Sequence, residues 1–160
     1  MPSEIVSKCA ETLKRKKYNI AFAESMTAGR MAAEFSLTEN SGNVLLGSIV
    51  CYDVIVKEKI MDIPHALIEK YTPESSEVTK ELAEKAAILF CSDFTAAITG
   101  LASAGGSETE EKPVGSIFIH LITPMGALAH NEVFSGNPEE IVSQTIDRTA
   151  ELILAELEKC

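Results

Sequence analysis

The amino-acid sequence predicts an α/β fold with helices on both faces of a mixed sheet. Short apolar runs of strand type alternate along the chain with stretches whose apolar residues recur at helical spacing. Late in the chain, residues 116–123 and 127–134 flank the turn "PMG", a strong hairpin signal that adds an antiparallel strand. The length of 160 residues and the lack of any linker or repeat fit a single domain covering residues 1–160.

The first half of the chain is predicted to alternate helix and strand before two short helical pieces. In order we expect a helix from Ser3, a strand at 19–23, a helix at 27–37, a loop at 38–43, a strand at 44–52, and helical pieces at 54–63 and 64–71. Ser3 is a suitable cap because its hydroxyl can accept from the free N–H groups of a first turn. The nearly continuous apolar run at 44–52 is typical of a central strand. Pro64 separates the two helical pieces because it lacks a backbone N–H.

The second half is predicted to hold a long helix, three strands and a final helix. We expect a helix within 72–91, strands at 94–100, 116–123 and 127–134, a Gly-rich loop at 101–115, and a last helix running to about Leu157. Either Ser75 or Ser76 can cap the helix within 72–91. Asn137 followed by Pro138 and two acids is the start signal of the last helix.

Composition and charge exclude several classes of protein. A formal net charge of -10 argues against a general nucleic-acid binder, because phosphate contacts need clustered Lys and Arg. No apolar run approaches the ~20 residues that span a bilayer, and the charged, amphipathic N-terminus is not a signal peptide. We therefore expect a cytoplasmic protein without membrane contact. The four cysteines form no Cys-x-x-Cys or Cys/His cluster, so we expect reduced thiols, three of them in the core, and no metal site.

Polar residues follow three of the predicted strands, where ligands bind in open α/β sheets. They are Glu24-Ser25-x-Thr27, Tyr52 with Lys57 close behind, and the loop that follows Thr99-Gly100. Each also has an ordinary structural interpretation. Ser25 or Thr27 can simply cap the next helix, Tyr52 can be a strand-end aromatic, Lys57 a solvated helix residue, and the loop a connector.

Taken together, the three places are consistent with a serine nucleophile. Such a serine needs a base to take its proton and donors to stabilise the oxyanion. The three histidines are poorly placed, since His65 lies in an amphipathic piece and His120 and His130 lie within the hairpin strands. Lys57 can act as a base if burial lowers its pKa, and backbone N–H groups after Ser25 are natural oxyanion donors.

Motifs in a fixed order carry a family resemblance across nearly the whole chain. They are "AES-T-G" from Ala23 to Gly29, "Y----K" from Tyr52 to Lys57, "S-EV" from Ser75 to Val78, "TG-A" from Thr99 to Ala102, "EKPVG" at 111–115, and "FSG" at 134–136. In these motifs the sequence resembles the C-terminal domain family of the competence/damage-inducible protein CinA, which includes bacterial nicotinamide mononucleotide deamidases. The resemblance implies a stand-alone form of this domain, folded as a three-layer α/β/α sandwich on a mixed five-stranded sheet.

The resemblance also implies an activity and the residues that perform it. It implies an amidohydrolase that converts nicotinamide mononucleotide to nicotinate mononucleotide and ammonia without metal or cofactor. Ser25 would be the nucleophile, Lys57 the base and then the acid, and Tyr52 the residue that orients Lys57 or relays the proton. The substrate-binding residues would be Glu24, Thr27, Gly29, Thr99, Gly100, Ala102, Gly105, Gly106 and Lys112. The expected partners are a small-molecule nucleotide amide and further copies of the chain in a homo-oligomer, with Met31 and Phe35 as exposed apolar residues.

The sequence departs from the family pattern where substrate is expected to bind. Family members usually read Tyr-Ser-Asn where this chain has Tyr52-Asp53-Val54, and the loop "TGLASAGG" is shorter and lacks the usual proline. Pro138 and Val142 stand where arginines are expected, so a phosphate clamp there would lose its bidentate donors. These departures leave an alternative: a catalytically weak or inactive member that serves as a small-ligand-binding or oligomeric interaction module.

Overall fold

The computed structural model, which describes residues 1–160, is built around one five-stranded sheet in the order β2-β1-β3-β4-β5. The strands are β1 (Ile20–Glu24), β2 (Leu45–Val50), β3 (Phe94–Gly100), β4 (Ser116–Thr123) and β5 (Gly126–Val133). β1 pairs in parallel with both β2 and β3, whereas β4 runs antiparallel to both β3 and β5. The predicted mixed sheet and the predicted hairpin are therefore confirmed.

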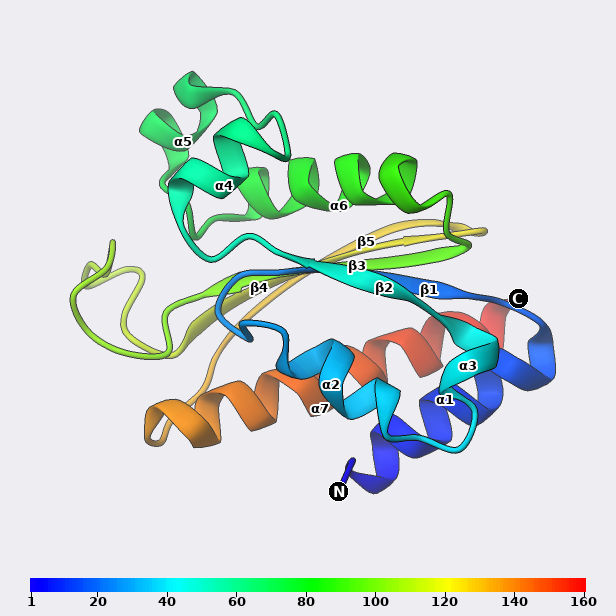
Figure 1. The fold of residues 1–160 in the computed structure, drawn as a ribbon. Coiled ribbons are helices and arrows are strands. Elements are labelled where there is room, and N and C mark those ends of the chain that lie inside the picture. The colour runs from blue at the N-terminus through cyan, green and yellow to red at the C-terminus, as the bar shows by residue number, and fades with distance from the viewer.

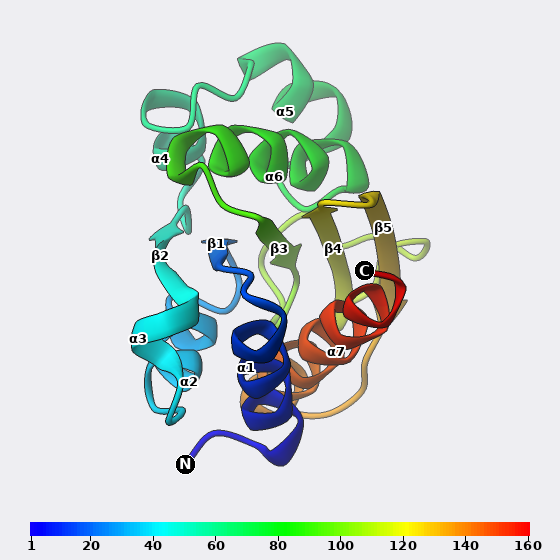
Figure 2. The same ribbon diagram turned by 90° about the vertical axis from the view of Figure 1, so that its right-hand side faces the viewer.

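Helices cover both faces of this sheet, which gives the predicted three layers (Figures 1 and 2). One layer holds α1 (Glu4–Lys16), α2 (Arg30–Ser36), α3 (Ser41–Val44) and α7 (Pro138–Lys159). The opposite layer holds α4 (Val54–Lys59), α5 (His65–Tyr71) and α6 (Ser76–Phe90). The sheet separates two apolar cores, the larger one against α1 and α7 and the smaller one against α6.

Helices α1, α6 and α7 begin at side-chain caps that the sequence predicts. Ser3 Oγ accepts from the Val6 N–H, and Ser75 Oγ accepts from the Val78 N–H, so Ser75 rather than Ser76 caps α6. At α7 the Asn137 side chain and that of Glu140 cap each other's backbone N–H groups reciprocally. None of the helices is both long and apolar enough to cross a membrane.

Three expectations about burial are wrong. β2 is an edge strand rather than a central one, and Leu46 and Val50 on it are 48% and 42% exposed. An apolar run of this kind does not distinguish a strand buried on both faces from an edge strand that leaves apolar side chains exposed. Met31 and Phe35 are fully buried because α2 turns them toward the larger core. Among the cysteines, only Cys9 and Cys51 are buried, since Cys91 is exposed and Cys160 is half-buried.

The topology brings the polar segments predicted to matter to one end of the sheet. The carboxyl ends of β1, β2 and β3, the start of α4 and the loop 101–115 all lie at the left in Figure 1. Parallel strands end at the same edge of a sheet, so residues far apart in sequence meet there.

Candidate active site

The buried carboxylate of Glu24 stabilises the turn between β1 and α2. Glu24, the last residue of β1, is fully buried, and both of its carboxylate oxygens accept hydrogen bonds. The donors are Thr27 Oγ1 (2.7 Å), the backbone N–H groups of Gly29, Met31 and Ala32 (3.0 Å each), and Ser48 Oγ (2.8 Å). A carboxylate in this place satisfies the free N–H groups at the start of α2 and interacts favourably with the helix dipole. Glu24 and its partners Thr27 and Gly29, expected at the substrate, thus shape the turn that holds Ser25.

Ser25 begins a tight turn with free backbone donors. Its own N–H donates to the carbonyl of Ile98 on β3 at 3.0 Å, which fixes the turn to the sheet. Ala28 and Gly29 then adopt left-handed backbone conformations, with φ of 48° and 93°, before α2 begins at Arg30. The N–H groups of Met26 and Thr27 donate to no acceptor in the protein. The turn therefore leaves the two backbone N–H groups that follow Ser25 without a protein acceptor.

Lys57 reaches Ser25 from the following strand–helix connection. Asp53 caps α4 through a 2.8 Å bond from the Ile55 N–H, and α4 then presents Lys57 to the interior. Lys57 is 1% exposed, and its Nζ lies 3.0 Å from Ser25 Oγ. The same nitrogen lies 2.6 Å from the Cys51 carbonyl and 3.2 Å from the Tyr52 carbonyl. Ser25 and Lys57, which the sequence assigns to one candidate site, thus lie within hydrogen-bond distance of each other.

Burial makes Lys57 easier to deprotonate than an exposed lysine. Burial lowers the pKa of Lys57, and the nearby Cys51, Glu74 and Asp53 oppose that shift only in part. As an ammonium, Lys57 donates to Ser25 Oγ and to the two carbonyls; as a neutral amine it keeps two N–H donors for the carbonyls and presents its lone pair to the Ser25 hydroxyl. In that state the Ser25 hydroxyl donates to Lys57 Nζ, which is the geometry that proton removal from Ser25 requires.

Tyr52 contacts Lys57 through its main chain. Its carbonyl helps to position the amine, whereas its side chain is 67% exposed. The Tyr52 hydroxyl makes no hydrogen bond to Ser25 or Lys57, and a proton relay through it stays a prediction.

A cavity of about 260 Å³ opens beside Ser25. Its walls are Ser25, Met26, Tyr52 and Glu74 together with residues 100–106. Of the residues expected at the substrate, the cavity is lined by Gly100, Ala102, Gly105 and Gly106. Glu24, Thr27, Gly29, Thr99 and Lys112 do not line it. Thr99 is instead buried, with its hydroxyl 2.8 Å from that of Thr79 on α6.

Lys112 fastens the loop 101–115 to the segment before α6. Its ammonium group donates to Thr72 Oγ1, to the Glu74 carbonyl at 3.0 Å and to Ser107 Oγ at 2.8 Å. Ser107 Oγ in turn donates to the Glu74 carboxylate. Burial lowers the pKa of Lys112, and the attraction of Glu74 opposes this shift. All three N–H donors of Lys112 are thus engaged within the protein, and its contact with substrate stays a prediction.

Glu74 was not among the expected site residues. It stands directly before Ser75 in "TPESSEV", where capping of α6 accounts for the polar residues on its own. Its place in the cavity wall depends on how the loop 101–115 folds over the segment before α6. No local pattern in the sequence signals that contact.

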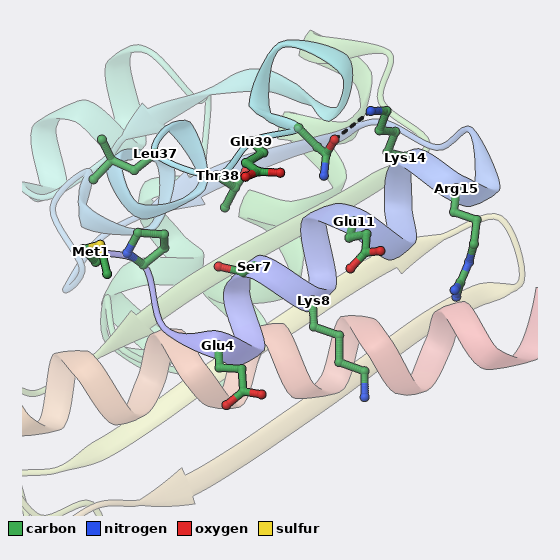
Figure 3. Close-up of a pocket in the computed structure, with 12 residues that line it drawn as sticks. Met1, Glu4, Ser7, Lys8, Glu11, Lys14, Arg15, Leu37, Thr38 and Glu39 are labelled. Carbon is green, nitrogen blue, oxygen red and sulfur yellow. Dashed lines mark hydrogen bonds between the residues drawn. The ribbon is translucent and has the colours of Figure 1, made fainter.

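A second, larger hollow lies elsewhere on the molecule. It has a volume of about 1210 Å³ and lies between α1 and residues 37–40, where Lys14 Nζ donates to the Asn40 side chain at 2.8 Å (Figure 3). Side chains of both charges line it, among them Glu4, Lys8 and Glu11. None of its lining residues belongs to the cavity beside Ser25. Nowhere in the structure do three or more His, Cys, Asp or Glu side chains gather closely enough to hold a metal ion.

Comparison with known proteins identifies the family. The family model described as CinA C-terminal domain matches residues 3–157. The chain belongs to the CinA C-terminal domain family.

Two relatives are similar in sequence to most of this chain. A CinA-like protein of Prochlorococcus marinus subsp. pastoris is 34% identical over 137 residues, covering 85% of this chain and 31% of the relative. A CinA-like protein of Flavobacterium psychrophilum is 30% identical over 147 residues, covering 92% of this chain and 35% of the relative. The chain thus spans about a third of the length of these curated relatives.

Two crystal structures superpose on nearly the whole chain. A CinA superfamily protein from Klebsiella pneumoniae has a TM-score of 0.92 at 19% identity, covering 98% of both chains. The competence/damage inducible protein from Agrobacterium tumefaciens has a TM-score of 0.89 at 22% identity, covering 99% of this chain and 98% of that one. At these identities the likeness establishes the shared α/β fold.

Proposed function

We propose that this CinA-family chain is a cytoplasmic serine amidohydrolase that cleaves the carboxamide of nicotinamide mononucleotide or a related amide. The observation that carries the proposal is the 3.0 Å contact between Ser25 Oγ and Lys57 Nζ at the edge of the cavity. A hydroxyl paired with a buried amine is an activated nucleophile. The members of the family that deamidate nicotinamide mononucleotide supply the substrate class.

In the first step, Ser25 Oγ attacks the carboxamide carbon while its proton moves to Lys57 Nζ. The electron pair of the carbonyl bond moves onto the amide oxygen, which becomes a tetrahedral oxyanion. The free N–H groups of Met26 and Thr27 are the donors nearest to Ser25 along the chain, and they are available to stabilise this oxyanion. The Cys51 and Tyr52 carbonyls hold the new Lys57 ammonium group in place.

In the second step, Lys57 gives its proton to the amide nitrogen as the carbon–nitrogen bond breaks. Ammonia leaves, and the acyl group remains on Ser25 as an ester. A water molecule then attacks the ester carbon while Lys57 takes one of its protons. Lys57 returns that proton to Ser25 Oγ when the carboxylic acid product is released. The cycle restores both side chains and consumes one water for each ammonia.

The test is ammonia release from nicotinamide mononucleotide and from the same amide without its phosphate, by the wild-type protein and two variants. Ser25→Ala and Lys57→Met should each lower kcat by at least about 10³-fold, since nucleophile and base are both lost from the reacting centre. Lys59→Met, two residues along α4 and exposed, is the matched control and should retain activity. Turnover that survives Ser25→Ala would contradict the mechanism. A wild-type protein that binds amides without releasing ammonia would support the alternative, a binding module.

A further inference from the structure

The cavity beside Ser25 has one charged side chain in its wall, the carboxylate of Glu74. Resting on the proposed function, we infer that the site takes a carboxamide that carries a positive charge and no phosphate, and that Glu74 binds the positive charge. A nicotinamide whose ring nitrogen is alkylated has this chemistry, because the pyridinium charge and the scissile amide share one ring.

Glu74 is held in place with one carboxylate oxygen free. Its Oε2 accepts from Ser107 Oγ, and its main-chain carbonyl is bound by Lys112. No protein donor contacts Oε1, so that oxygen is available to a ligand. The Glu74 charge also lies near enough to Lys57 to raise the pKa of that amine against the effect of burial. A cation seated at Glu74 is therefore close to the Ser25–Lys57 pair.

The cations near the cavity have no donor left for a phosphate. Lys57 Nζ is surrounded by Ser25 Oγ and two carbonyls, and Lys112 Nζ by two hydroxyls and the Glu74 carbonyl. No arginine lines the cavity. A phosphate recruited here would have to break contacts that hold either the base or the loop.

The backbone donors of the Gly-rich loop are also partly occupied. The N–H groups of Gly105 and Gly106, which lie in the cavity wall, each donate to the Glu108 carboxylate at 2.8 Å. Successive backbone N–H groups of this kind are a common anion-binding device. Here a carboxylate of the same loop fills it, and these bonds lower the pKa of Glu108. The exposed Glu110 and Glu111 follow on the same loop and add to its negative charge.

These features together set a preference among amides. A phosphate dianion would meet the Glu74 carboxylate and find the Gly105 and Gly106 N–H groups already bound to Glu108, and like charges at short range repel. A ribose without phosphate carries no negative charge and can lie against the mostly small residues of the loop 100–106. We expect nicotinamide riboside to be favoured over nicotinamide mononucleotide, and over uncharged nicotinamide, by about tenfold each, or about 1.4 kcal/mol.

The experiment measures binding independently of turnover. Isothermal titration calorimetry of the Ser25→Ala protein with the riboside, the mononucleotide and nicotinamide should give the tightest Kd for the riboside. Glu74→Gln, added to this protein, keeps an acceptor for Ser107 and should remove the preference for the riboside over nicotinamide. Glu77→Gln, on the exposed first turn of α6, is the matched control and should leave all three Kd values unchanged.

The binding measurements test the inferred ligand preference, and ammonia release tests the amidohydrolase proposal. Binding of the mononucleotide as tight as that of the riboside overturns the inference even if Glu74→Gln is poorly folded, and so does a Glu74→Gln protein that keeps the riboside preference. Failure to bind any of the three amides also overturns it. Ammonia release by the wild-type protein is scored separately. A riboside that binds tightly but is not hydrolysed would leave the inference standing and remove the amidohydrolase proposal.

Discussion

Lys57 Nζ lies 3.0 Å from Ser25 Oγ across 32 residues of sequence, and both side chains are almost fully buried. Parallel pairing of β1 with β2 makes this contact possible, because both strands end at the same edge of the sheet. The residues that follow the two strands, Ser25 and the segment leading to Lys57, therefore lie close together. The Cys51 N–H strengthens the link by donating to the Glu24 carbonyl at 2.6 Å. The pair is thus a product of the strand register, and changes in the supporting structure should affect it predictably.

The pH dependence of activity should report the state of Lys57. The base must be neutral to take the Ser25 proton, and burial lowers its pKa from 10.5. We expect kcat/KM for the hydrolysed amide to rise with pH to a plateau, with an apparent pKa clearly below 10.5. The profile should be recorded with the free enzyme between about pH 6 and 10. An ascending limb centred at or above 10.5 would show that Lys57 is not the titrating base.

Glu24→Gln should disrupt the corner that holds Ser25. The substitution replaces one acceptor oxygen by an NH₂ group that faces N–H and hydroxyl donors, and it removes the charge that they stabilise. We expect the free energy of unfolding to fall by about 2–4 kcal/mol, since hydrogen bonds to charged groups contribute about 1.5–3 kcal/mol each and only some are lost. Urea denaturation measures the change. The exposed Glu39→Gln serves as control, and equal stability of the two variants would contradict this role of Glu24.

Gly100→Ala should distort the floor of the cavity. A Cβ at this position would overlap Met26 Sδ and lie 2.7 Å from the Ser116 carbonyl oxygen. Because Met26 follows Ser25, its displacement should lower kcat as well as stability, the latter by about 1–3 kcal/mol. Gly42→Ala is the matched control, since a Cβ there meets nothing within 4 Å. Thermal denaturation and ammonia release are the two readouts, and an active, fully stable Gly100→Ala protein would refute the close packing at this glycine.

Local sequence signals predicted the fold well because they act over short distances. The cap at Ser3, the Asn137-Pro138 start and the hairpin turn each fix an element boundary by contacts within a few residues. The family motifs then placed Ser25 and Lys57 in one site, and hydrogen-bond geometry agrees with that placement. The edge position of β2 could not be read in the same way, because its apolar run looks alike at the centre and at the edge of a sheet.

Which polar residues face the cavity and which support the surrounding structure was harder to predict, for a physical reason. A polar residue near the end of a strand can face the cavity or support the turn beside it, and both uses need the same residue types. Glu24 and Lys112 support the structure, whereas Glu74 faces the cavity. The difference depends on how the loop 101–115 folds onto the segment before α6, which is a long-range contact that no local pattern encodes.

The stability of the protein should depend on pH through Lys57. Its pKa is lower in the folded state than the ordinary value of 10.5, so between these two values the unfolded chain binds more protons. The free energy of unfolding therefore rises with pH in that window. The contribution is complete above about 10.5 and is lost as pH falls through the folded pKa.

Lys57→Met removes the titrating amine, so its comparison with wild type isolates the contribution of Lys57 to the pH dependence of stability. The difference in unfolding free energy between wild type and Lys57→Met should grow in favour of wild type as pH rises from 7 to 10, by about 1.4 kcal/mol for each pKa unit of the shift. Urea denaturation at several pH values measures it, with the exposed Lys59→Met as control, whose difference from wild type should stay nearly constant. A Lys57→Met difference that is equally flat would mean that Lys57 titrates as an ordinary solvated lysine. That result would also remove the neutral amine on which attack by Ser25 depends.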